Sequence, residues 1–301
     1  MITIISALLA IAFYTLIERK FIGYIQHRKG PNKPIVIGVI VPFSDASKLL
    51  LKEKKNTIAI NIKYHIIAPL IMIILSIILW FIYPHFNQSL FLKFRIIYFL
   101  CITRVGVYTT FIAGWGSNSK WRILGALRGI AQTISYEVGL SLILISFILY
   151  IIRINVIVIV QNQYIWIIFI FLPLRIAWII SILAETHRAP LDFTEGESEL
   201  VSGFNIEYRR SIFALIFIAE YINILLIRLM TSVVLSSNWI NLELIIKTVT
   251  LSVMFIWTRR ALPRLRYDIL IDSLWKKILP LSLTWFLTSI LIIALYSDFL
   301  L

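Results

Sequence analysis

Long apolar runs recur along the whole chain, separated by polar stretches. A helix that crosses a membrane needs about 20 consecutive and mostly apolar residues, because each residue advances it by about 1.5 Å. Eight runs approach or reach this length, and we expect each to form a transmembrane helix. The runs are residues 2–22, 66–83, 94–115, 129–152, 164–184, 212–235, 242–257 and 278–296.

The composition agrees with this pattern. Hydrophobic residues make up 60% of the 301 residues and charged residues only 15%, against roughly 25% charged residues in an average soluble domain. A soluble all-α protein is therefore disfavoured. The sequence predicts an all-α, polytopic membrane protein with about eight transmembrane helices, folded as a single domain over residues 1–301. Its large loops, residues 23–65, 116–128, 185–211 and 258–277, are expected on one side of the membrane.

The net charge of +14 follows the same arrangement. Most of the Lys and Arg residues lie in those four loops, and the positive-inside rule places such loops in the cytoplasm or the mitochondrial matrix. Both termini are then expected on the opposite side. The charge therefore indicates membrane topology, and we expect no nucleic acid partner. Most acidic residues share the basic side, which suggests a surface that binds other proteins.

Redox cofactors are expected outside this chain. Cys101 is the only cysteine, so a four-cysteine zinc or iron–sulfur site is excluded within the chain. The histidines show no metal-ligand spacing, and no glycine-rich nucleotide motif is present. We therefore expect no metal site and no covalently bound cofactor.

One shorter element is expected between the first two spans. Residues 42–53 (PFSDASKLLLKE) have the pattern of an amphipathic helix. Ser44 is a candidate N-cap residue, and Leu49, Leu50 and Leu51 supply an apolar edge. We expect this helix to lie at the membrane surface.

Two acidic residues fall inside expected spans. Glu137 and Glu220 each lie about eight residues into a helix, roughly 12 Å deep at 1.5 Å per residue. Carboxylates in a membrane are costly and commonly mark proton or ion paths. The alternative is a structural ion pair, for which Arg104, Arg175 and Arg228 are available.

Two loop segments also concentrate charge. Residues 184–208 hold six acids, which can share protons and raise one another's pKa, although a solvated acidic loop has the same composition. Residues 18–32 (ERKFIGYIQHRKGPN) surround the end of the first span. They could hold a polar headgroup whose tail lies in the bilayer, or act only as a basic anchor.

At these segments the sequence resembles a known family, the mitochondrially encoded and bacterial quinone-site membrane subunits of respiratory complex I (NADH:ubiquinone oxidoreductase). The resemblance is carried by ERKFIGYIQHRKGPN, PFSDASKLLLKE, AGWGSNSKWRILGALRGIAQTISYEV, AETHRAPLDFTEGESELVSGFNIEY, FIAEY and WTRRALPRLRYD, which follow one another in the family's order.

The resemblance implies a function and partners. Ubiquinone would be the substrate, entering a tunnel from the bilayer toward a hydrophilic quinone-site subunit. Electrons would come from FMN and iron–sulfur clusters on partner subunits, and antiporter-like membrane subunits would continue the proton path. Together with the lack of an import signal and an Ile- and Lys-rich composition, it favours the mitochondrial inner membrane, with both termini on the intermembrane-space side.

The resemblance also implies roles for individual residues. Quinone-binding candidates are Glu18, Arg19, Arg28, Phe213, Phe217 and Arg264. Candidates for proton or charge coupling are Asp45, Tyr136, Glu137, Glu185, Arg188, Asp192, Glu195, Glu197, Glu199, Glu207 and Glu220, with Arg188 as a counter-charge for the acidic segment.

Some positions depart from the family pattern. His187 stands where the family usually has Asn, and Arg209 and Arg210 stand where small residues are common. Arg104 lies within the third span, where a small residue is expected.

Other classes of protein stay open at this point. They are a secondary ion transporter, which often shows two similar halves that we do not see here, the related membrane subunit of an energy-converting hydrogenase, and a scaffold without a catalytic role.

Overall fold

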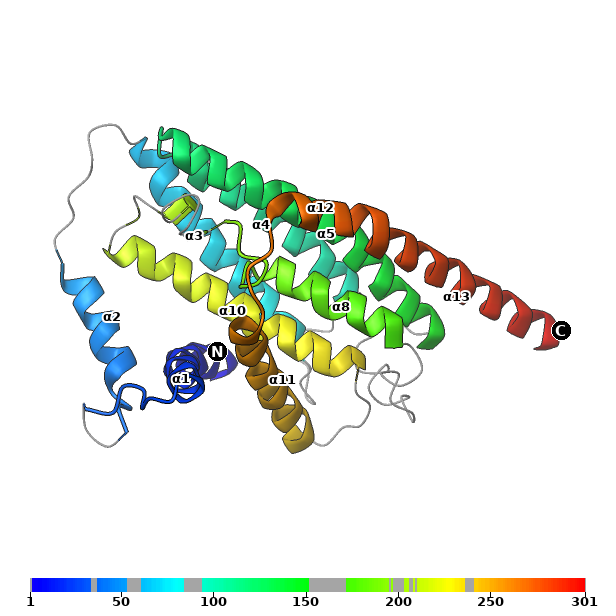
Figure 1. Ribbon diagram of the computed structural model, residues 1–301, viewed down its shortest axis with the longest axis horizontal. Helices are drawn as coiled ribbons and strands as arrows, with labels where there is room; N and C mark the ends of the chain where they lie inside the picture. Colours follow the sequence, from blue (N-terminus) through cyan, green and yellow to red (C-terminus); the bar gives the residue numbers. More distant parts are fainter. Residues whose placement is uncertain are drawn as a thin grey trace.

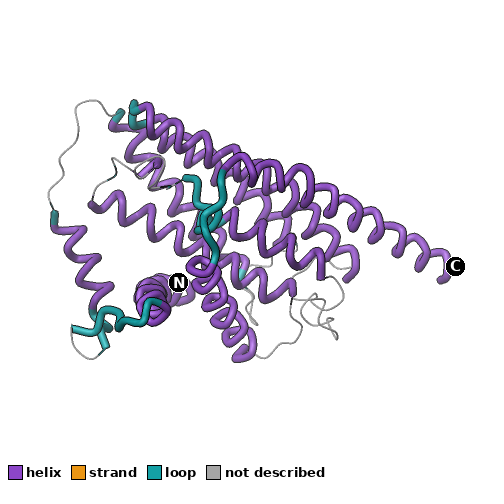
Figure 2. The backbone as a smooth tube through the Cα atoms, viewed as in Figure 1, coloured by secondary structure: helices purple, strands orange, loops and turns teal. Residues whose placement is uncertain are grey.

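The computed structural model describes residues 2–33, 37–52, 61–83, 94–151, 172–194, 196, 203–205, 208, 210–235 and 241–300. All regular structure within these ranges is helical, as Figure 2 shows in purple. The expected all-α class is therefore confirmed for the described part of the chain.

The helices follow one another in a simple order. They are α1 (Ile2–Ile25), α2 (Val41–Leu51), α3 (Ile62–Leu79), α4 (Arg95–Trp115), α5 (Lys120–Ile151), α8 (Leu172–Glu185), α10 (Arg210–Leu235), α11 (Asn241–Ala261), α12 (Tyr267–Ser273) and α13 (Leu279–Leu300). Short 3₁₀ turns lie at Trp80–Ile82 (η1) and Gly203–Asn205 (η2), and a π-helical turn at Leu274–Ile278 (η3) joins α12 to α13.

Helices α3, α4, α5, α8 and α10 form the main bundle, in which α3 packs on α4 and α10, and α5 packs on α4 and α8. Its core contains Phe99, Phe147 and Trp178, each at most 2% exposed. Helices α12 and α13 pass over α5, and the C-terminal half of α13 extends beyond the bundle (Figure 1).

A second group of helices packs on the side of α10. Helix α1 contacts α10 and α11, and α2 contacts α1 and α10. A small cluster of buried residues joins the group and contains Ile11, Tyr14, Tyr221 and Ile256. The cluster brings the end of α1 to the middle of α10, which positions the site described below.

Five described helical stretches are long and apolar enough to cross a membrane, namely residues 62–82, 95–115, 120–149, 211–234 and 267–295. They correspond to five of the eight expected spans. Of the other three, α1 carries the charged residues Glu18, Arg19 and Lys20 before its last turns, α8 is described over only 14 residues, and α11 carries Glu243 and Lys247. Those three spans stay predictions.

Three helix starts differ from the expectation. Helix α3 begins at Ile62, so residues 62–65 of the expected loop 23–65 are helical. Helix α5 begins at Lys120, so residues 120–128 of the expected loop 116–128 are helical. The charged side chains suggested a loop, but Arg122 is fully buried and donates its Nε–H to the carbonyl of Phe204. Helix α12 likewise begins at Tyr267, which reduces the expected loop 258–277 to residues 262–266.

The expected helix over residues 42–53 is present as α2, but Ser44 is not its N-cap residue. The cap position is Ile40, and the Ser44 hydroxyl donates to the Val41 carbonyl at 2.8 Å within the first turn. Leu50 and Leu51 are 66% and 84% exposed. The apolar edge of α2 is therefore available to a membrane surface or to another subunit.

Candidate functional site

Aromatic rings follow one face of α10 at intervals of one helical turn. The Phe213 and Phe217 ring centroids are 4.5 Å apart, and the Phe217 and Tyr221 centroids are 6.3 Å apart. Tyr221 then meets Tyr14 of α1 edge to face, with the centroids 5.8 Å apart. Residues four apart on a helix lie on the same face, so the expected pair Phe213 and Phe217 is part of a longer aromatic row.

The aromatic row ends at a buried carboxylate. The Tyr221 hydroxyl donates to Glu18 at 2.8 Å, and Arg259 of α11 forms an ion pair with the other oxygen of Glu18. Glu18 is only 6% exposed. A buried charge is tolerated where it is paired and hydrogen-bonded, and both conditions are met here.

Further arginine side chains surround this carboxylate. The Arg188 guanidinium lies 4.7 Å from the Tyr221 ring centroid, and that of Arg228 lies 4.6 Å from the Tyr14 ring centroid. Glu18, Arg188, Arg228 and Arg259 all line one small cavity of about 10 Å³. The sequence suggested Arg188 as a counter-charge for the acidic segment, and its contact with Tyr221 was not expected.

The remaining basic candidates lie elsewhere. Arg19 pairs with Asp45 of α2 at 2.9 Å, and both side chains are about half exposed. Arg28 is exposed and donates to Gln26 at 2.9 Å. Arg19 and Arg28 are not among the residues that line the Glu18 cavity, so their quinone-binding roles stay predictions.

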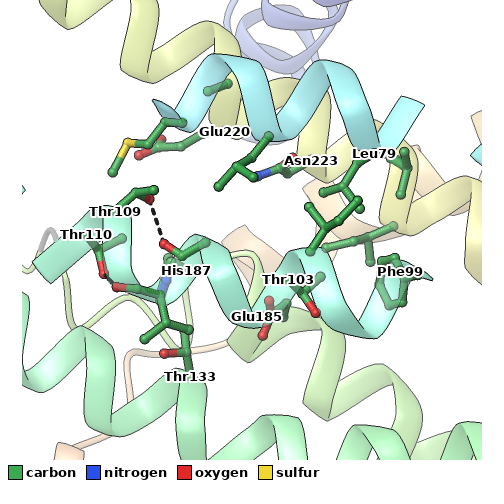
Figure 3. Close-up of a pocket in the computed structure, with 18 of the residues that line it drawn as sticks. Leu79, Phe99, Thr103, Thr109, Thr110, Thr133, Glu185, His187, Glu220 and Asn223 are labelled. Carbon is green, nitrogen blue, oxygen red and sulfur yellow. Dashed lines mark hydrogen bonds between the residues drawn. The ribbon is translucent and has the colours of Figure 1, made fainter. Parts of the chain in front are cut away.

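A larger cavity, which we call the acid chamber, lies between α3, α4, α5 and α10 and has a volume of about 110 Å³. Glu185 and His187, from the start of the acidic segment, and Glu220 and Asn223 of α10 all line it (Figure 3). Its other polar lining residues are Thr103, Thr109, Thr110 and Thr133. The fold therefore places two acids that are 35 positions apart in sequence on one cavity.

Several buried polar atoms of this chamber have no partner in the described part of the chain. They are one carboxylate oxygen of Glu185, Nδ1 of His187 and the amide oxygen of Asn223. A site for water needs at least about 10–15 Å³ and a few polar partners. The chamber has both the volume and the acceptors for several water molecules, so it can support proton movement between its acids.

The acids of this region influence one another. Glu185 is the first residue beyond the expected span 164–184, and burial, with a smaller effect of Glu137, raises its pKa to about 8. Burial and the cation of Arg188 lower the pKa of His187 to about 4. Glu185 can therefore change its protonation state near neutral pH, whereas His187 stays neutral there.

Glu137 is buried in α5 beside α4. Arg104 is its counter-charge in the described part of the chain, with Nε of Arg104 3.9 Å from a Glu137 oxygen. The structural ion pair that the sequence left open is therefore present, and Arg104 provides it. Tyr136 is 1% exposed and belongs to the core of the main bundle, with its hydroxyl unpartnered among the described residues.

Arg264 lies against the acidic segment. Its guanidinium is 5.6 Å from the Phe193 ring centroid and occupies the space that a side chain at Gly196 would need. The Leu265 amide also donates to the Pro190 carbonyl at 3.2 Å. Asp192, the residue before Phe193, is half buried. The remaining acidic candidates, Glu195, Glu197, Glu199 and Glu207, lie outside the described residues.

The sequence did not predict that some residues belong to the site. Tyr221 lies one turn beyond Phe217, so continuing that row by four residues would have found it. Arg228 was considered only as a possible ion-pair partner for the acids of the spans. Tyr14 and Arg259 carry no local signal of this kind, because they reach the site only through the packing of α1, α10 and α11. The described residues contain no cluster of three or more potential metal ligands.

The fold and the site together define a multi-pass membrane protein with a charged cavity and an acid-lined cavity inside its helical bundle. The sequence model of the NADH dehydrogenase family matches residues 1–290. Several relatives share more than 40% of their residues with this chain. Each of the following is named "NADH-ubiquinone oxidoreductase chain 1".

The Aedes aegypti protein is 46% identical over 287 residues, covering 95% of this chain and 92% of that protein. The Locusta migratoria protein is 45% identical, with 95% and 91% covered. The Trichosurus vulpecula protein is 43% identical over 300 residues, with 95% and 93% covered. The chain belongs to the NADH dehydrogenase family, as a membrane subunit of the NADH–ubiquinone oxidoreductase. The family membership therefore disfavours the three alternatives that the sequence left open. They are a secondary transporter, a subunit of an energy-converting hydrogenase, and a scaffold without a catalytic role.

Proposed function

We propose that this chain forms part of the ubiquinone access tunnel and couples the reduction of the quinone to proton translocation. In this proposal the substrate comes from the bilayer, and electrons arrive from FMN and iron–sulfur clusters on hydrophilic partner subunits. The chain works in the mitochondrial inner membrane, with both termini in the intermembrane space. Antiporter-like membrane subunits then receive the charge or the protons that leave it.

The quinone part of the proposal is supported by the aromatic row and its charged end. Phe213, Phe217 and Tyr221 form a continuous row of aromatic rings, and a flat, apolar headgroup packs favourably against such rings. Glu18 and Arg259 lie where the row ends. The Arg259 guanidinium can donate to a quinone carbonyl oxygen, and the Glu18 carboxylate can accept from a hydroxyl of the reduced quinol.

The coupling part rests on one observation, that Glu185 and Glu220 line the same chamber. Reducing a quinone adds negative charge and consumes protons. A carboxyl with a pKa near 8 responds to such a change at neutral pH. Neighbouring carboxyls that share a hydrated cavity then exchange protons, since their titrations are coupled. Glu137 continues this sequence of acids toward α4.

The variants Glu185→Gln and Glu220→Gln test the coupling in the assembled enzyme. We expect each to reduce NADH:ubiquinone activity or the proton pumping linked to it, while NADH:ferricyanide activity, which needs only the hydrophilic subunits, is retained. Glu243→Gln is the matched control, because Glu243 pairs with Lys247 at the start of α11 and lies outside both cavities. Normal pumping in both chamber variants would refute the proposal.

A further inference from the structure

One face of α4 is exposed along its whole length. Val105 and six further residues of α4 are exposed, and these six follow one another at intervals of four, three, four, three and four positions, which is the spacing of a left-handed helix–helix contact. They are Ile97, Cys101, Arg104, Tyr108, Phe111 and Trp115. The face therefore has the periodicity of a packing surface, and it contains one charged residue.

Arg104 stands near the middle of this span. It lies nine residues after Arg95 and eleven before Trp115, so about 14 Å of helix separates it from the nearer end. Its side chain is 59% exposed, whereas that of Glu137 is 11% exposed. Glu137 thus lies on the inner side of the pair, and the guanidinium faces outward.

The pair with Glu137 does not satisfy Arg104. A guanidinium has five N–H donors, and in the described part of the chain its polar contact is the single ion pair of 3.9 Å. Hydrocarbon offers no acceptor, and charged side chains within the membrane face other protein or water. Lipid phosphates are also remote, because the hydrocarbon core is about 30 Å thick and Arg104 is near its centre.

We propose that this α4 face binds a transmembrane helix of another subunit of the same enzyme, and that an Asp or Glu of that helix pairs with Arg104. The charge requires an anionic or strongly accepting partner, and a helix carries one to this depth. Tyr108, Phe111 and Trp115 add the aromatic surface that is common at protein interfaces. The inference rests on membership of a multi-subunit enzyme and not on the proposed quinone path.

Labelling of the wild-type enzyme with a lipid-soluble carbene reagent tests whether this face is covered. We expect the segment from Cys101 to Tyr108 to be protected in the intact enzyme and labelled after the membrane subunits are dissociated. Equal labelling in both states would show that lipid covers this face, and the proposal would be wrong.

The acidic partner is tested by Arg104→Lys, which keeps the charge and introduces an amine. A hydrophobic carbodiimide should then form an amide between residue 104 and an Asp or Glu in a transmembrane segment of another subunit. The unmodified enzyme, which has no amine at this position, is the control. A crosslink to Glu137 alone, to a second copy of this chain, or to no carboxylate would overturn the proposal, whatever the quinone activity of the variant.

Discussion

Glu18 and Tyr221 are 203 positions apart in the chain, yet the Tyr221 hydroxyl donates a hydrogen bond of 2.8 Å to the Glu18 carboxylate. Both residues are less than 10% exposed. The bond joins α1 to α10 and places the Glu18 carboxylate, which lines the smaller cavity, at the end of the aromatic row. Its loss would leave a buried charge with one partner fewer.

Tyr221→Phe removes this hydroxyl and leaves the ring. A hydrogen bond to a charged group contributes about 1.5–3 kcal/mol, so we expect a loss of stability of this order and weaker binding of ubiquinone. Tyr64→Phe is the control, because Tyr64 is 51% exposed. Thermal inactivation of NADH:ubiquinone activity measures the effect. Equal inactivation of the two variants would mean that the bond to Glu18 contributes little.

Phe217→Leu tests the aromatic row. The ring of Phe217 lies between Phe213 and Tyr221, and an aromatic contact contributes about 0.5–1.5 kcal/mol beyond its buried area. If the row binds the headgroup, KM for ubiquinone should rise about 2- to 10-fold while kcat changes little. Phe81→Leu, at a residue 44% exposed in η1, should leave KM unchanged. A change in kcat alone would argue against a binding role.

Gly129→Ala tests how the acidic segment is held on α5. An added methyl group at Gly129 would overlap the side chain of Thr194, so that residue must move. Forced repacking of this kind costs about 1–3 kcal/mol, and we expect less assembled enzyme on native gels. Gly139→Ala, in the same helix, meets only an ordinary contact of 3.6 Å with Ile278 and should assemble normally.

The chemistry of His187 predicts a dependence of stability on pH. Its pKa is lowered from 6.5 to about 4 by burial and by Arg188, so the folded protein binds a proton less readily than the unfolded chain. The stabilisation is present above pH 6.5 and is lost as the pH falls toward 4.

His187→Asn should reduce this acid sensitivity. The backbone of His187 has φ 48, a left-handed conformation that Asn adopts readily. We therefore expect normal thermal stability at pH 7.5 and slower inactivation than wild type at pH 5. An unchanged difference between these two pH values would show that other groups cause the acid sensitivity.

Local patterns predicted much of the fold. Where the structure describes them, the apolar runs are helical, and the amphipathic residues 42–53 form α2 with bounds shifted by one or two residues. The start of α5 was missed because Lys120, Arg122 and Arg128 suggested a loop. Arg122 is instead buried against Tyr208, with its guanidinium 4.1 Å from the ring centroid. A buried arginine leaves the same sequence signal as an exposed one.

The site was predictable only where its residues are close in sequence. Phe213 and Phe217 lie one turn apart, and Glu137 and Glu220 stand out as acids within apolar runs. The cavity shared by Glu185 and Glu220, the pairing of Glu18 with Tyr221, and the position of Arg228 over Tyr14 depend on tertiary packing. No periodicity in the sequence reports such contacts.

In the proposed function, Glu185 and Glu220 act on one path through the acid chamber. This shared role is tested most directly by measuring protons translocated per NADH oxidised in vesicles for wild type, Glu185→Gln, Glu220→Gln and the double variant. If both acids serve one path, each single variant lowers the ratio and the double variant is no worse than the more damaged single variant. Normal ratios in both single variants, or effects that multiply in the double variant, would contradict the account.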